Sequence, residues 1–283
     1  MKSLAKVGSF IFVFIGTLLL AKELSSFLFG WDPSFFSHSG AGHVVFYLVF
    51  IFYVVIFQMF VNRAPFSSLG LALYPKWSLT VLKGWCVGCA AFIGYTLLMD
   101  YFGVIELRMN RGVGRLILSC LIAVSAFGIA FTEEVLFRGF FLQTMLKDLP
   151  VWIAVTVTGV LFVLFHKLGS VQDFWTVPYD AMLAGGIFSL HLLLCAAYLK
   201  TKSLYLPIGI HSGLVFAKVV FRDSKLIGVI DPASYWFGLK GDARRGFLAW
   251  ILFLSGIFIL KFLISKHEKR AAVQSSQAEG SAG

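Results

Sequence analysis

Three ionisable side chains stand inside an apolar stretch of this chain: Glu133, Glu134 and Arg138. Residues 116–131 before them are almost entirely hydrophobic, and an apolar run that includes Phe140 follows. A charged group near the centre of a bilayer costs about 2.5–3.5 kcal/mol on insertion scales, so such residues usually serve a function. One arginine cannot neutralise two adjacent carboxylates. The stretch therefore predicts a functional polar site inside a membrane.

The spacing of these residues suggests different roles for the two carboxylates. Glu134 and Arg138 are four residues apart with the acid first, which favours an ion pair along one helix face. We interpret this pair as support for the site. Glu133 lies about 100° further around a helix, so it can point into a cavity instead. A carboxylate held in an apolar pocket is a suitable general base near neutral pH.

Two histidines extend this candidate site. If the chain turns near Leu149 and Pro150, Glu133 precedes the turn by about 16 residues and His166 follows it by about 16. At about 1.5 Å per residue, an antiparallel helical hairpin then brings both side chains to the same depth, about 24 Å from the turn. The second histidine is His211, which belongs to a later apolar segment. We expect all of these residues to meet in one polar cavity.

Small residues surround His211 in the sequence. Gly209 and Gly213 flank it and would let a neighbouring backbone or a peptide approach closely. Lys218 shares the helix face of His211, although we expect its ammonium group to extend to the membrane interface. His191 is a competing candidate, but its leucine-rich surroundings, with no second polar residue one turn away, favour a hydrogen-bonded packing role.

The composition places all of these residues in a membrane protein. The chain has 283 residues, of which 59% are hydrophobic and only 13% are charged, whereas soluble domains have about 25% charged residues. Long apolar runs predict an all-α, polytopic bundle of about eight transmembrane helices. In such a protein the net charge of +10 is better explained by loops that face anionic lipid than by nucleic-acid binding. The four cysteines lie in apolar segments, and we interpret them as small buried residues.

We expect one membrane bundle with four parts along the chain. Residues 1–114 supply the N-terminal spans, 115–221 the core spans, 222–270 a loop and the last span, and 271–283 a disordered tail. The first apolar segment, 8–29, lacks a convincing small-residue cleavage site, so we expect it to remain as an uncleaved span. The other expected spans are approximately 43–61, 79–102, 116–137, 151–166, 181–199, 204–221 and 247–264. The distribution of lysine and arginine weakly favours cytoplasmic ends.

The three motifs resemble a known family when they are taken together. Glu133-Glu134-x-x-x-Arg138, then Phe162-x-x-x-His166, then His211 after one further span, is similar to the CAAX prenyl protease and bacteriocin-processing family (CPBP, also called Abi). The resemblance covers residues 115–220 approximately. The motifs stand in the family's order on the fourth, fifth and seventh of the eight expected spans.

This resemblance implies an intramembrane endopeptidase with a water-accessible polar cavity. By position, it implies that Glu133 activates the attacking water with help from His166, and that His211 helps to stabilise the oxyanion. It also implies that Glu134 and Arg138 support the site and that Phe162 shapes it. The family commonly has Asn or another polar residue where this chain has Val215. We expect Ser212 or Lys218 to replace that hydrogen-bond donor.

Metal dependence is a second open point of the resemblance. Glu133, His166 and His211 are a set that can bind zinc with one open position. However, a carboxylate–histidine pair can also activate water without metal, and the chain has no His-Glu-x-x-His motif. We therefore expect a metal-free, glutamate-dependent mechanism, with zinc as the alternative.

Other functions remain possible interpretations of the same residues. A non-catalytic immunity or scaffold protein would keep the fold, and a proton-coupled transporter would use the carboxylates and histidines as a proton relay. We find neither inverted repeats, which would favour transport, nor an aspartate-rich motif for prenyl transfer. For the peptidase, the expected partners are a membrane-associated peptide or protein substrate and the lipid bilayer, without nucleic acid. The expected location is the bacterial inner (cell) membrane, as a multi-pass protein.

Overall fold

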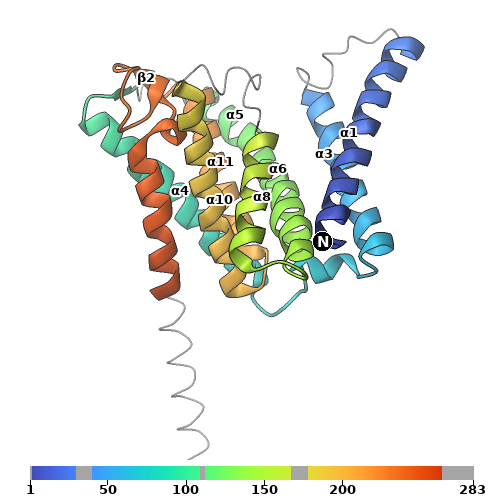
Figure 1. The fold of residues 1–283 in the computed structure, drawn as a ribbon. Helices are drawn as coiled ribbons and strands as arrows, with labels where there is room; N and C mark the ends of the chain where they lie inside the picture. Colours follow the sequence, from blue (N-terminus) through green and yellow to red (C-terminus); the bar gives the residue numbers. More distant parts are fainter. Residues whose placement is uncertain (1, 30–39, 109–111, 167–177, 263–283) are drawn as a thin grey trace, which may run out of the picture. The chain divides into compact units, whose positions relative to one another are not determined.

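A computed structural model describes the backbone of residues 2–29, 40–108, 112–166 and 178–262 (Figure 1). Side chains are described for these residues except 18–29, 40–46 and 178–180. The tail that we expect at 271–283 lies outside the described residues.

The described part of each apolar segment that we expected as a span lies on helical structure. The longer α-helices are α1 (Lys2–Phe29), α3 (Gly40–Ile56), α4 (Trp77–Tyr101), α8 (Val151–Phe165), α10 (Pro178–Thr201), α11 (Tyr205–Asp223) and the last helix, Phe247–Phe262. A further helical stretch is built from α5 (Val113–Ala123), α6 (Ser125–Glu134), the π-helix η3 (Val135–Leu142) and α7 (Gln143–Met145). Short elements are the π-helix η1 (Phe57–Val61) and the 3-10 turns η2 (Phe66–Leu69), η4 (Leu239–Gly241) and η5 (Ala243–Arg245).

Among the described residues, three helices are long and apolar enough to cross a membrane: Trp77–Tyr101, Val113–Met145 and Ala181–Thr201. Tyr47–Val61, Val151–Phe165 and Phe247–Phe262 are shorter apolar helices. Helices satisfy their own backbone hydrogen bonds, so they suit a lipid environment. The fold class is the predicted one, an all-α membrane helical bundle.

The chain forms two compact units, each assembled from separate stretches of sequence. Unit 1 contains Met1–Ala90, Gly112–Thr158 and Ser203–Ser224. Unit 2 contains Ala91–Arg111, Gly159–Lys202 and Lys225–Gly283. Helices α4 and α8 each contribute residues to both units.

Phenylalanine side chains form a large part of the core of unit 1. Helices α1 and α3 lie side by side (Figure 1), and the ring centroids of Phe14 and Phe50 are 4.5 Å apart. The ring of Phe10 lies 5.1 Å from Phe57 and 5.1 Å from Phe140 of η3. Such edge and tilted contacts add to the energy of burial. This cluster holds α1 and α3 against the π-helix that follows the two carboxylates.

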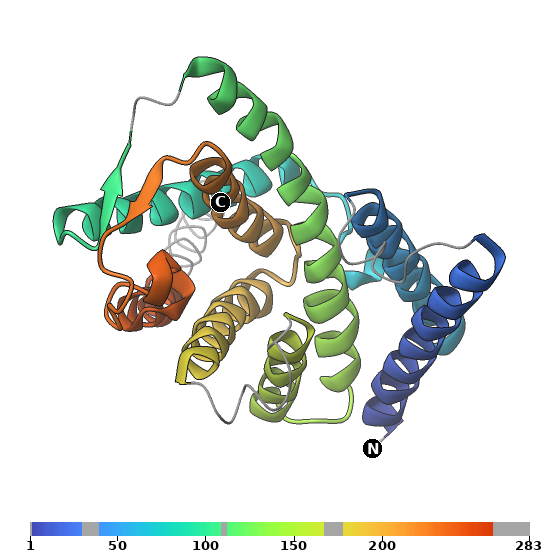
Figure 2. The same cartoon turned by 90° about the horizontal axis from the view of Figure 1, so that it is seen from above.

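Four glycines allow α4 and α11 to pack with their backbones in contact (Figure 2). A Cβ atom on Gly84 would lie 2.8 Å from the carbonyl oxygen of Leu206, and one on Gly88 would lie 2.2 Å from that of Ile210. On α11, a Cβ atom on Gly209 would lie 2.3 Å from the carbonyl oxygen of Val81, and one on Gly213 would lie 2.2 Å from that of Trp85. Small residues spaced by four are a common basis of close helix pairs in membranes.

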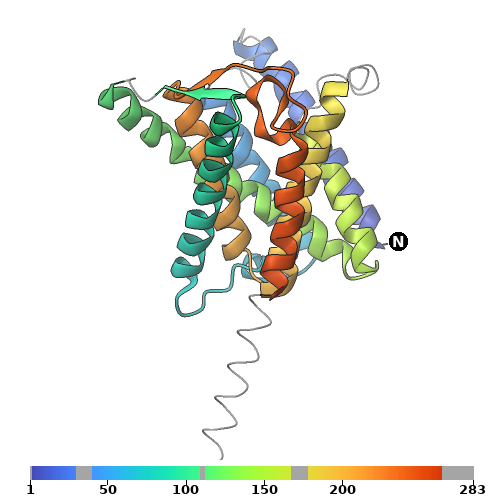
Figure 3. The same ribbon diagram turned by 90° about the vertical axis from the view of Figure 1, so that its left-hand side faces the viewer.

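Unit 2 contains a short antiparallel β-ribbon that the hydrophobic pattern did not predict (Figure 3). Its strands are β1 (Ile105–Leu107) and β2 (Ile227–Val229). Ile105 packs in a cluster with Tyr95, Met99, Val104 and Ala249. The hydroxyl of Tyr95 donates a hydrogen bond to the carbonyl oxygen of Phe237 at 3.1 Å.

The interpretation of all four cysteines as buried residues is wrong. Only Cys195 is buried, whereas Cys86 is exposed on the surface of α4, and Cys89 and Cys120 are half-buried. In a membrane protein the outer face of a helix contacts lipid, so a small, weakly polar thiol is compatible with that position.

Candidate active site

The two carboxylates lie at the junction of an α-helix and a π-helix. Glu133 and Glu134 are the last residues of α6, and Arg138 belongs to η3. Every residue of η3 is buried. π-Helical turns are rare and occur frequently at functional sites. The sequence pattern, which we interpreted with regular α-helical geometry, did not reveal this widening of the helix.

Glu134 and Arg138 form the ion pair that their spacing predicted. Arg138 Nη1 donates to Glu134 Oε1 at 2.9 Å, and both side chains are fully buried. Burial of two charges is costly, and their mutual attraction offsets this cost only when the geometry is good. The negative charge of Glu134 is therefore balanced within one helical turn.

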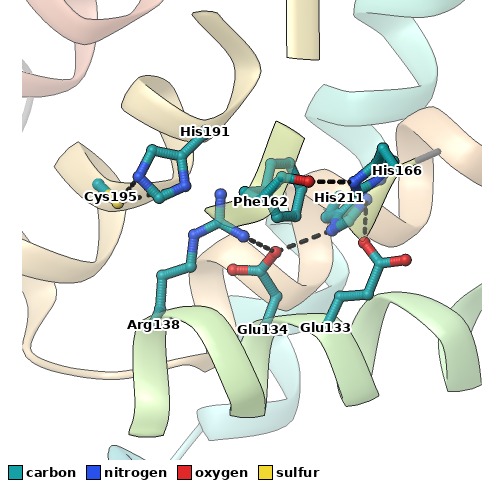
Figure 4. A network of polar contacts seen from close by, with 8 residues as sticks. All are labelled: Glu133, Glu134, Arg138, Phe162, His166, His191, Cys195 and His211. Carbon is teal, nitrogen blue, oxygen red and sulfur yellow. Dashed lines mark hydrogen bonds and ion pairs between the residues drawn. The ribbon is translucent and has the colours of Figure 1, made fainter. Parts of the chain in front are cut away.

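His211 of α11 lies between the two carboxylates (Figure 4). Its Nδ1 is 2.8 Å from Oε1 of Glu134, the same oxygen that accepts from Arg138. Its Nε2 is 3.8 Å from Oε2 of Glu133, whose side chain is 16% exposed. A hydrogen bond at one ring nitrogen fixes the tautomer and orientation of the imidazole. With Nδ1 donating to Glu134, Nε2 is the nitrogen presented to Glu133.

The contact between α11 and α4 determines where His211 lies. His211 is two residues from both Gly209 and Gly213, which corresponds to about 200° of rotation in an α-helix. The glycines pack against α4, so the imidazole points to the opposite side of α11, where α11 packs against α5 and α6. The expected close approach at Gly209 and Gly213 is thus confirmed, and the neighbour is a helix of this chain.

The remaining candidates on α11 differ in their hydrogen bonding. Ser212 is fully buried, and its hydroxyl donates to the carbonyl oxygen of Gly209 at 3.1 Å. Val215 and Lys218 are both half-buried. Because the hydroxyl proton of Ser212 already bonds to its own helix, it is a poor donor for a substrate.

A second group of aromatic and histidine side chains belongs to unit 2 (Figure 4). His166, one residue after α8, has Nδ1 2.8 Å from the carbonyl oxygen of Phe162, and the two rings are in contact with centroids 4.4 Å apart. Fully buried His191 has Nε2 3.2 Å from the sulfur of Cys195. The expectation that His191 has no polar residue one turn away is therefore wrong, because Cys195 occupies that place.

The structure brings together Glu133, Glu134, Arg138 and His211 within unit 1. His166 and Phe162 belong to unit 2, so their meeting with Glu133 stays a prediction. No group of three or more His, Cys, Asp and Glu side chains in the described part of the chain is arranged to hold a metal ion. Glu134 is also occupied by Arg138 and His211, which makes it a poor additional ligand.

The comparison with protein families gives a match over the same region. Residues 115–217, about a third of the chain, match the family described as type II CAAX prenyl endopeptidase Rce1-like. The family predicted from the motifs is confirmed. The matched segment contains the carboxylate pair, Phe162, both candidate histidines and Val215. No curated protein and no solved structure matches the chain. The match supports an integral membrane protein and, in general, a CAAX-type intramembrane endopeptidase.

Proposed function

We propose that this protein hydrolyses a peptide bond of a membrane-associated substrate, with Glu133 as the general base that activates water. The observation that carries the proposal is the chain of contacts from Arg138 to Glu134 to His211, with Nε2 of His211 facing Glu133. It gives the two neighbouring carboxylates different tasks. Glu134 is held by a cation and a histidine, whereas Glu133 is the partly exposed one.

In the proposed reaction, Glu133 takes a proton from water as the water oxygen attacks the carbonyl carbon of the peptide. The electron pair of the carbonyl bond moves to its oxygen, which becomes the oxyanion. When the tetrahedral intermediate collapses, the amine leaves and receives the proton from Glu133. A positioned acid–base residue of this kind contributes about 100- to 10,000-fold to the rate.

Glu134 and Arg138 act through His211 in this proposal. Glu134 accepts a hydrogen bond from Nδ1–H of His211 and thereby aims Nε2 at the reacting centre, as a carboxylate does for the histidine of other hydrolases. When His211 is protonated, its Nε2–H donates to the oxyanion. We further propose that His166 assists the water and that Phe162 shapes the site. The multi-pass protein would act in a bacterial inner membrane, where it would process lipid-anchored or membrane-spanning peptides.

The decisive experiment replaces Glu133 by Gln and measures cleavage of a membrane-proximal peptide in proteoliposomes. Glu133→Gln keeps the size of the side chain and removes the proton acceptor, so the rate should fall about 100- to 10,000-fold while the thermal unfolding temperature in detergent stays unchanged. Glu106→Gln is the matched control, because Glu106 is an exposed carboxylate of unit 2 that contacts Arg108. Full activity of Glu133→Gln would end the assignment. Cleavage by neither variant nor wild type, in folded protein, would favour a non-catalytic or transport role.

A further inference from the structure

The oxyanion of the proposed reaction needs more donors than the described part of α11 provides. Stabilisation of a tetrahedral intermediate commonly uses two hydrogen-bond donors, and removal of one costs about 100- to 1000-fold in rate. Pro207 lies one turn before His211 on α11, and Val215 lies one turn after it. Neither side chain can donate a hydrogen bond. The hydroxyl of Ser212 already bonds to Gly209. Lys218 lies seven residues further along α11, about 10 Å from His211, and we expect its ammonium group to extend to the membrane interface. We therefore look for the second donor on another helix.

Helix α3 supplies a polar side chain on its inward face. Phe50 and Val54 of α3 and Phe57 at the start of η1 are buried along one stripe. Tyr47 continues that stripe three residues before Phe50. Leu48, by contrast, is 65% exposed on the outer side. Tyr47 is half-buried, which makes it the polar end of an otherwise apolar stripe.

This stripe packs against the helix that carries the carboxylates. α3 contacts both α6 and η3, and the rings of Phe57 and Phe140 are 6.2 Å apart. The two helical stretches run in the same direction (Figure 1). Tyr47 lies ten residues before Phe57, which is about 15 Å along the helix. Glu133 lies seven residues before Phe140, which is about 10 Å. The side chain of a tyrosine is long enough to span the difference. Consistently, the phenol of Tyr47 is within electrostatic range of the Glu133 carboxylate.

We propose that Tyr47 is a further catalytic residue, whose phenol O–H donates a hydrogen bond to the oxyanion formed when Glu133-activated water attacks the peptide. The inference rests on the proposed function. A tyrosine hydroxyl is a suitable donor because it is neutral at physiological pH and held by a rigid ring. In this proposal α3 provides the hydrogen-bond donor that α11 lacks.

The test is Tyr47→Phe, which keeps the ring and removes only the hydroxyl. The expected result is a fall in kcat of about 100- to 1000-fold with little change in KM and an unchanged unfolding temperature. Tyr53→Phe is the control, because Tyr53 lies on the same helix and its hydroxyl pairs with Thr17 at 2.6 Å. That variant should keep wild-type kcat.

A second variant separates a catalytic role from a structural one. Val215→Asn introduces a donor one turn from His211, so adding it to Tyr47→Phe should restore kcat at least tenfold, which a packing defect would not allow. Wild-type kcat in Tyr47→Phe, together with an inactive Glu133→Gln, would overturn the role of Tyr47 and leave the peptidase proposal standing. An active Glu133→Gln would instead defeat the proposed function itself.

Discussion

The contact between α4 and α11 leads to the sharpest prediction about how the fold controls the site. In Gly88→Ala the new Cβ would lie 2.2 Å from the carbonyl oxygen of Ile210, whereas ordinary Cβ contacts begin at 3.4 Å. The helices must therefore separate by about 3.4 − 2.2 = 1.2 Å at this point. The opposing atom is backbone, so no rotamer change can relieve the overlap. Overpacking of this kind costs about 1–3 kcal/mol.

The same displacement should reach the catalytic residues. His211 points away from the glycine face, so separation of the helices drives its ring towards α6 and disturbs its 2.8 Å contact with Glu134. A misplacement of about 1 Å can cost about 100-fold in rate. We expect Gly88→Ala to lower the unfolding temperature in detergent and to reduce kcat by about that factor.

Gly94→Ala is the matched control for this prediction. It makes the same change on the same helix, and a Cβ at Gly94 has no atom within 4 Å. Because alanine favours helix over glycine by about 1 kcal/mol, this variant should be at least as stable as the wild type and equally active. The reasoning fails if Gly88→Ala matches Gly94→Ala in both unfolding temperature and rate.

Three further predictions concern charge and metal. Arg138→Ala leaves the buried Glu134 without its cation and should cost about 3–5 kcal/mol, visible as loss of folded protein in detergent; unchanged stability would contradict a buried pair. Hydrogen bonds from Ser3 lower the pKa of exposed Asp148 below its ordinary 3.8. This contact should therefore stabilise the fold fully above the ordinary pKa, and the stabilisation should be lost as the pH falls through the lowered pKa. Asp148→Asn should lack this acid-dependent part of the unfolding temperature, and identical pH profiles would refute the contact. Finally, a zinc chelator should leave peptidase activity unchanged, whereas reversible inhibition restored by zinc would make metal ligands of Glu133, His166 and His211.

The chemistry-bearing residues could be found in the sequence because each violates a strong physical preference. Two carboxylates and an arginine inside an apolar run are energetically costly, so their presence indicates a function. The spacing of four between Glu134 and Arg138 also sufficed to predict their ion pair, because it depends only on helical geometry. The helical segments could also be predicted from their long apolar runs, although among the described residues three helices are long and apolar enough to cross a membrane.

Pairings between distant segments could be predicted less completely. Gly209 and Gly213 indicated a close neighbour, but nothing local to them shows that this neighbour is α4 with its own Gly84 and Gly88. Helical periodicity likewise did not reveal the π-helix η3, because its hydrophobic residues are buried on all sides and leave no polar face to count. Cys195 beside His191 was overlooked because a cysteine in an apolar run is counted as a small hydrophobic residue, although its thiol can take part in a weak hydrogen bond.

The sequence by itself determined which residues carry charge inside the membrane and which helices present them. Only the tertiary structure decided that His211 shares an oxygen of Glu134 with Arg138 and turns its other nitrogen towards Glu133. That arrangement depends on the distance and rotation between α6 and α11, which are set by backbone contact with α4 on the far side of α11. Spacing along one helix fixes angles within that helix, whereas packing between helices depends on distant residues: Glu134 and His211 are 77 positions apart.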